Sequence, residues 1–210
     1  MAEAAAHADH DHDDHGHGEL KENNFMGLPN LKLAMWAFLG SECMFFGSLI
    51  GVYFFYHGHS LDGPLPADIF SITITTISTF ILLTSSLTMA FAVDAMKQSK
   101  AGRTKLFLAL TALLGASFVG FQVYEFSHFY LEGGLGLSTS LFASSFYVMT
   151  GTHGTHVTVG VIWLLMALSF VHRGKIKPGN YLPIEVAGLY WHFVDIVWII
   201  IFTFVYLLEF

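Results

Sequence analysis

The sequence predicts an all-α integral membrane protein built as a five-helix transmembrane bundle. Hydrophobic residues make up 54% of the chain and charged residues 12%, a balance typical of membrane proteins. Five segments reach the roughly 20 apolar residues that a helix needs to cross the hydrocarbon core. Glycine and proline mark the short gaps between them, as in Gly63-Pro64, Gly133-Gly134 and Pro178-Gly179. We therefore expect one membrane domain over residues 25–210, with helices at about 32–56, 68–96, 105–130, 140–171 and 183–208.

The first predicted helix carries one carboxylate deep in an apolar segment. Glu42 lies about 15 Å from the start of the helix, given the helical rise per residue, and so close to the membrane midplane. Gly47 and Gly51 form a Gly-x-x-x-Gly pattern, which predicts that another helix packs closely there.

The second predicted helix is rich in hydroxyl side chains, and the third carries a carboxylate, Glu125. We expect the hydroxyls to bond back to carbonyls of their own helix and to contribute nothing reactive. They belong to Ser71, Thr73, Thr75, Thr76, Ser78, Thr79, Thr84, Ser85, Ser86 and Thr88.

The fourth and fifth predicted helices each carry two ionisable side chains at a spacing of three residues. That spacing places His153 and His156 on one face of the fourth helix, and His192 and Asp195 on one face of the fifth. Asp195 lies in a segment that is otherwise apolar from Leu182 to Leu208, so it should point into the bundle rather than at lipid. Three glycines of the fourth helix predict close packing, namely Gly151, Gly154 and Gly160.

The positive charges all fall on one side of the predicted bundle. They precede the first helix or lie between the second and third helices and between the fourth and fifth. The positive-inside rule then places the N-terminus in the cytoplasm and the C-terminus outside. The nine residues are Lys21, Lys32, Lys97, Lys100, Arg103, Lys105, Arg173, Lys175 and Lys177.

Residues 1–24 differ in character from the rest and are rich in histidine and aspartate. This tail has almost no apolar surface to bury, so we expect it to be disordered on the cytoplasmic side. Cys43 is the single cysteine, which excludes an internal disulfide.

Six ionisable side chains fall within the predicted hydrocarbon span at comparable depth, and intramembrane charge usually marks function. A metal site is one interpretation, but the pattern of di-iron bundles is absent and we expect no metal. A proton relay is a second, although Ser41 alone could carry a proton between Glu42 and the near end of its helix. The residues favour a third, buried hydrogen-bonded pairs that fix helix register at about 0.6 kcal/mol each. The six are Glu42, Glu125, His153, His156, His192 and Asp195.

Four motifs resemble subunit III of haem–copper terminal oxidases, in the same order and on the corresponding helices. Together they cover about residues 30–210. They are Ser41-Glu42-Cys43-Met44-Phe45-Phe46, Gln122-x-x-Glu125-Phe126, Thr150-Gly151-Thr152-His153-Gly154-Thr155-His156-Val157 and Trp191-His192-Phe193-Val194-Asp195-Ile196-Val197-Trp198.

The resemblance implies a non-catalytic subunit of a proton-pumping complex that reduces oxygen to water in a bacterial cytoplasmic membrane. Haem and copper are then expected in the partner subunits and none in this chain. The expected partners are subunit I in direct contact, subunit II, a small subunit IV and membrane phospholipid, with no nucleic acid. The six buried groups would form a polar core that supports proton uptake.

The resemblance favours cytochrome c as electron donor through Glu185, while Ile196-Val197-Trp198-Ile199 also resembles the quinol type. Arg173 could contact a lipid head group. Many members of the family have seven helices, so two are missing here. A homologue associated with nitric-oxide reductase and a stand-alone membrane metalloprotein are the remaining alternatives.

Overall fold

The computed structural model describes residues 29–56, 72–131, 141–177 and 179–207, and helices account for nearly all of these residues. Each of the five described helices is long and apolar enough to cross a membrane, which confirms the predicted fold class. The predicted tail at 1–24, the positions 68–71, 140 and 208, and most of the two longer connections lie outside the described residues. The helices are α1 (Asn30–Tyr56), α2 (Ile72–Lys97), α3 (Ala101–Leu131), α4 (Leu141–His172) and α5 (Leu182–Phe202), and α5 continues into the π-helical segment η2 (Thr203–Leu207).

Two helices end in tight turns that shorten the connections. Ser99, after α2, adopts a left-handed conformation with φ 59°, and the amide of Lys100 donates to the carbonyl of Ala95. Gly174, after α4, adopts the same left-handed conformation with φ 69°. Glycine adopts it without steric cost because it has no Cβ atom. The tight turn at Ser99 lets α3 begin at Ala101 rather than near the predicted residue 105.

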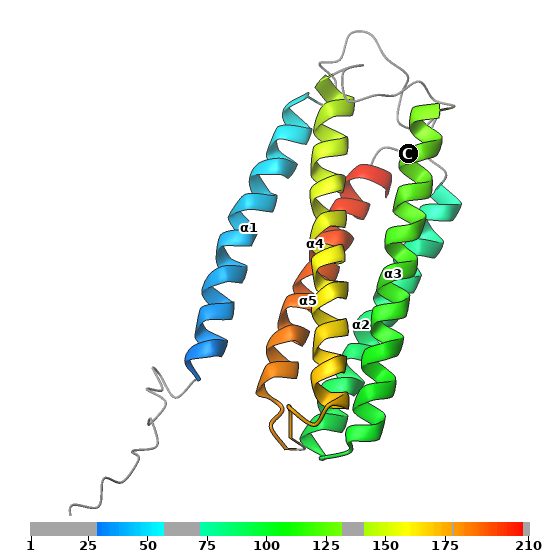
Figure 1. Ribbon diagram of the computed structural model, residues 1–210. Helices are drawn as coiled ribbons and strands as arrows, with labels where there is room; N and C mark the ends of the chain where they lie inside the picture. Colours follow the sequence, from blue (N-terminus) through cyan, green and yellow to red (C-terminus); the bar gives the residue numbers. More distant parts are fainter. Residues whose placement is uncertain (1–28, 57–71, 132–140, 178, 208–210) are drawn as a thin grey trace, which may run out of the picture.

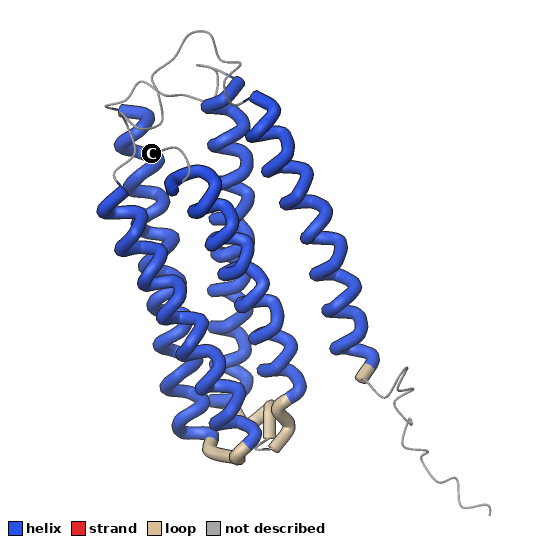
Figure 2. The backbone as a smooth tube through the Cα atoms, turned by 180° about the vertical axis from the view of Figure 1, so that it is seen from behind, coloured by secondary structure: helices blue, strands red, loops and turns tan. Residues whose placement is uncertain are grey.

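α2, α3, α4 and α5 form the compact part of the bundle, and α1 lies beside it (Figure 1). α1 packs against α4 and α5, and its lower end diverges from the other helices in both Figure 1 and Figure 2. Large apolar side chains along α1, such as Trp36, Met44 and Phe55, are exposed. A surface of this kind fits lipid or a protein partner rather than water.

The centre of the bundle is formed around Trp191 of α5, which is 1% exposed. Its indole nitrogen donates to Ser85 Oγ of α2 at 3.0 Å. Its ring lies against Gly115 of α3 and Gly160 of α4, where a methyl group at Gly160 would come within 2.8 Å of the ring atom Cζ3. One side chain therefore contacts three other helices, and both glycines are needed for its ring to fit.

The segments that carry the positive charges meet at one end of the bundle. The start of α1, the turn between α2 and α3 and the connection from α4 to α5 all lie at the lower end in Figure 1. We call this the basic end, defined by Lys32, Lys97, Lys100, Arg103, Lys105, Arg173, Lys175 and Lys177.

Candidate functional site

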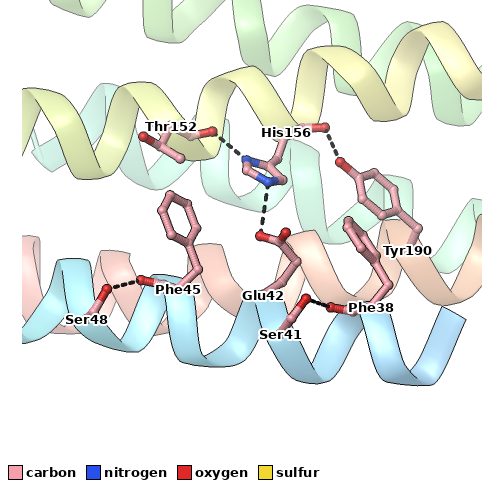
Figure 3. A network of polar contacts seen from close by, with 8 residues as sticks. All are labelled: Phe38, Ser41, Glu42, Phe45, Ser48, Thr152, His156 and Tyr190. Atoms are coloured by element: carbon pink, nitrogen blue, oxygen red, sulfur yellow. Dashed lines mark hydrogen bonds and ion pairs between the residues drawn. The ribbon is translucent and has the colours of Figure 1, made fainter. Parts of the chain in front are cut away.

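The contact between Glu42 and His156 joins α1 to α4 deep in the membrane span. His156 Nε2 lies 3.2 Å from Glu42 Oε2, and the exposed fractions of the two side chains are 20% and 16%. Figure 3 shows both side chains pointing toward each other between the two helices. The contact is an ion-pair approach rather than an aligned hydrogen bond, because Oε2 has no hydrogen-bond partner among the described residues.

His156 makes two further contacts beside the one with Glu42. Its Nδ1 lies 2.8 Å from the carbonyl oxygen of Thr152, which can only accept, so Nδ1 carries a hydrogen. The other ring nitrogen, Nε2, is the one that faces the Glu42 carboxyl. Tyr190 of α5 donates its hydroxyl to the carbonyl of His156 at 3.0 Å and joins a third helix to the site (Figure 3).

The serines near Glu42 do not extend this site into a relay. Ser41 Oγ donates to the carbonyl of Phe38, and Ser48 Oγ to that of Phe45, both at 2.7 Å within α1 (Figure 3). Ser41 was the one residue that could pass a proton along the first helix, and its hydroxyl instead bonds to its own backbone.

Glu125 of α3 is 8% exposed and accepts a hydrogen bond from Thr75 of α2 at 2.5 Å. A hydroxyl donor satisfies one carboxyl oxygen and so lowers the cost of burial. This contact joins α2 and α3, the most extensively packed pair of helices.

His153 of α4 is fully buried and lies against α5. Its Nε2 donates to the carbonyl oxygen of Val194 at 3.2 Å, and its ring stacks on Trp198 with centroids 4.8 Å apart. Phe118 of α3 meets the same ring edge-on at 5.8 Å. His153 therefore faces α5 and α3, whereas His156 faces α1, although the spacing predicts one shared face.

His192 of α5 contacts a hydroxyl of α2, and Asp195 lies three residues further along the same helix. His192 Nδ1 is 2.6 Å from Ser86 Oγ. Asp195 is 3% exposed, and neither of its carboxyl oxygens has an aligned hydrogen bond among the described residues. The two side chains share a face, as their spacing predicts.

The six candidate residues thus lie in four separate contacts rather than one connected network. Comparable depth does not bring them together because they point to different neighbouring helices. Within the described part of the chain, no three His, Cys, Asp or Glu side chains come close enough to hold a metal ion.

The hydroxyls of α2 bond back to carbonyls of their own helix as predicted, for example those of Thr79 and Ser85, but several also contact other helices. Thr79 and Ser85 accept the indole hydrogens of Trp198 and Trp191, at 2.9 and 3.0 Å. Thr75 and Ser86 contact Glu125 and His192. The signal that sequence reasoning missed is the spacing of Thr75, Thr79, Ser85 and Ser86 along one side of α2.

The prediction of close packing at glycines holds for two glycines of α4 but not for those of α1. Gly154 and Gly160 of α4 pack tightly, against Gln122 of α3 and Trp191 of α5. Gly151 has only an ordinary contact, 3.8 Å from Phe126. Gly47 and Gly51 of α1 meet nothing within 4 Å, so the predicted close approach there is wrong for this chain alone.

Two further candidate residues lie at the basic end. Glu185 of α5 forms salt bridges with Lys32 of α1 and Lys97 of α2, whose Nζ atoms lie 3.2 and 3.6 Å from its Oε1. These contacts join three helices. Arg173 is exposed directly after α4.

Comparisons with known proteins agree with the motifs. The model of the family "Cytochrome c oxidase subunit III" matches residues 18–209. The chain is similar to cytochrome c oxidase subunit 3 of Alkalihalophilus pseudofirmus, with 41% identity over 85% of this chain and 87% of that protein. It is equally similar to quinol oxidase subunit 3 of Bacillus subtilis, with 42% identity over 84% of this chain and 86% of that protein. Cytochrome c oxidase subunit 3 of Bacillus subtilis is 38% identical over 85% of this chain and 86% of that protein. The chain therefore belongs to the cytochrome c oxidase subunit III family, as a multi-pass membrane subunit of a haem–copper oxidase complex.

Proposed function

We propose that the chain is the non-redox subunit of a proton-pumping terminal oxidase, which it stabilises and supplies with lipid contacts and proton-uptake support. Its direct partner is subunit I, and subunit II and a small subunit IV belong to the same complex. Haem and copper reside in those partners. The observation that carries the proposal is that five of the six ionisable side chains within the membrane span make a polar contact with another helix. Such contacts suit a scaffold.

The complex lies in a bacterial cytoplasmic membrane, with the basic end of this chain on the cytoplasmic side. Support comes from the bacterial relatives and from the collection of the described positive charges at one end. The N-terminus is then cytoplasmic and the C-terminus lies outside.

Contact with subunit I and lipid is supported by the outward surface of α1. This helix has little buried surface, and a methyl group added at Gly40, Gly47 or Gly51 would meet nothing within 4 Å. Small residues at a helix surface let a second helix approach closely. The row suits a helix of a partner subunit.

Lipid binding is supported by an apolar groove of about 400 Å³ where α1 diverges from α4 and α5. Met35 and Phe38 of α1 face Trp163 of α4 and Val186 of α5 across it. The groove lies at the basic end, and the exposed Arg173 of that end suits a phosphate head group.

The donor is cytochrome c in this proposal, which rests on Glu185. A quinol is the second candidate, favoured by the 42% identity to quinol oxidase subunit 3 of Bacillus subtilis. Purification of the complex from native membranes in mild detergent tests both. A co-eluting haem protein that consumes oxygen with reduced cytochrome c is expected. If the complex oxidises quinol but not cytochrome c, the donor is a quinol. Elution of the chain without haem would contradict the proposal.

Glu42→Gln is expected to leave the haem content of the complex unchanged, with a stability loss below about 1 kcal/mol. The glutamine amide can donate to His156 Nε2, so the helix contact persists. The measurement is the haem-to-protein ratio of the purified complex. His156→Ala is the matched comparison, because it leaves the Glu42 carboxyl buried without the ring and should lower the yield. Loss of haem in Glu42→Gln would mean that the carboxylate itself holds the complex together.

A further inference from the structure

A cavity opens between α2 and α5 at the basic end and reaches into the membrane span. Its volume is about 290 Å³. Apolar side chains of both helices form its walls, and the polar side chains that line it are Asp94, Lys97, Glu185 and His192. The first two of these are exposed and His192 is half-buried, so the cavity runs from the surface to the imidazole.

The mouth of this cavity carries charges of both signs. Glu185 lies between Lys32 and Lys97, and Asp94 accepts a hydrogen bond from Gln98 at 2.6 Å. Charged side chains favour water at the mouth, and His192 lines the same cavity.

His192 leads inward to a carboxyl group that lacks an aligned partner. Its Nδ1 lies 2.6 Å from Ser86 Oγ, and Asp195 follows three residues later on the same face of α5. Both carboxyl oxygens of Asp195 are buried and make no aligned hydrogen bond among the described residues. A buried carboxylate without a partner costs several kcal/mol, so this site favours a carboxyl that holds a proton.

We propose that the cavity, His192 and Ser86 form a proton inlet that fills and empties the buried carboxyl of Asp195 from the basic end. A proton reaching the outer ring nitrogen of His192 is matched by transfer of the Nδ1 proton to Ser86. The serine hydroxyl passes its own proton to Asp195. Filling the site leaves the imidazole as its other tautomer, with the hydrogen on the outer nitrogen. The reverse steps empty the site and restore the first tautomer.

The helices around Asp195 contribute few other titratable or charged groups to this route. α5 carries His192 and Glu185, and α2 carries Asp94 and Lys97 at the mouth. α4 contributes His153, which bonds to the carbonyl of Val194 next to Asp195. α1 contributes Lys32 at the mouth and, beyond Tyr190, the Glu42–His156 pair.

The inlet goes beyond the scaffold role, because it gives the chain a protonatable group of its own. The use of the inlet by the complex rests on the proposed function, in which this chain supports proton uptake. Proton exchange at Asp195 does not depend on that function, so an experiment can reject either proposal without the other.

Infrared spectroscopy of the intact complex tests the inlet through the carbonyl stretch of a protonated carboxyl. We expect a band that is absent in Asp195→Asn and that shifts when the complex is moved into D₂O. Ser86→Ala and His192→Leu should slow this shift about tenfold, equivalent to about 1.4 kcal/mol in the barrier. Thr84→Ala is the matched control on α2, because its hydroxyl bonds to the carbonyl of Phe80 in the same helix at 2.8 Å.

Exchange in Ser86→Ala at the wild-type rate would overturn the inlet, as would a wild-type spectrum without a band that depends on Asp195. Ser86→Ala removes one half-buried hydroxyl, so it decides the question even if His192→Leu fails to assemble. Oxygen consumption by the same samples separates the two proposals. Normal turnover with unaltered exchange in Ser86→Ala would reject the inlet alone.

Discussion

Replacing Trp191 by alanine is expected to lower the free energy of unfolding by about 3–5 kcal/mol. Trp191 is 1% exposed and contacts α2, α3 and α4 from its place on α5. Its removal leaves a cavity at the centre of the bundle and deprives Ser85 of a donor. Denaturant titration of the purified chain or complex in detergent, followed by helical circular dichroism, measures the loss.

Two comparisons separate packing from a general effect of losing tryptophan. Trp36 of α1 is 53% exposed, so Trp36→Ala should cost little in the same assay. Gly160→Ala should cost about 1–3 kcal/mol, because the new methyl group meets the Trp191 ring. Gly120 has nothing within 4 Å, and Gly120→Ala should be neutral. Equal stabilities of the two glycine variants would contradict the central position of Trp191.

His153→Ala is expected to destabilise the chain by about 3 kcal/mol and to reduce assembly of the complex rather than its turnover. The ring is fully buried, stacks on Trp198 and donates to the carbonyl of Val194. Alanine removes the ring contact and leaves a buried carbonyl without its donor. The yield of assembled complex and the turnover per haem are measured on the same membranes.

His172 provides the matched control for His153, since it ends the same helix and is exposed. His172→Ala should assemble normally. His153→Gln retains an amide donor and should recover part of the yield. If the His153→Ala complex assembles fully but has lost its turnover, the structural interpretation of this histidine is wrong.

The helices and the burial of the polar residues were predictable from the sequence. Hydropathy and length locate membrane spans, because the hydrocarbon core requires a run of apolar residues. The cost of intramembrane charge also predicts that Asp195 and Glu125 point inward, and both are buried. The helix ends differ by a few residues where Ser99 and Gly174 form tight turns.

The partners of the polar residues were not predictable in the same way. Lipid and the bundle interior are both apolar, so the pattern of apolar residues does not show which side of a membrane helix faces a neighbour. Periodicity therefore placed His153 and His156 together, while the structure turns them to different helices. Likewise Gly47 and Gly51 match a packing motif and yet face away from the bundle.

The position of α1 has a consequence for the order in which the protein is made and inserted. α1 is the first of the five spans to be synthesised, but the residue that pairs with Glu42 belongs to α4. The nascent helix thus enters the bilayer with a carboxyl that has no partner until the fourth span emerges. α2 and α3 are adjacent in sequence and pack on each other extensively, so they can associate first. α1 can therefore complete its contacts with the bundle only after α4 and α5 are in place.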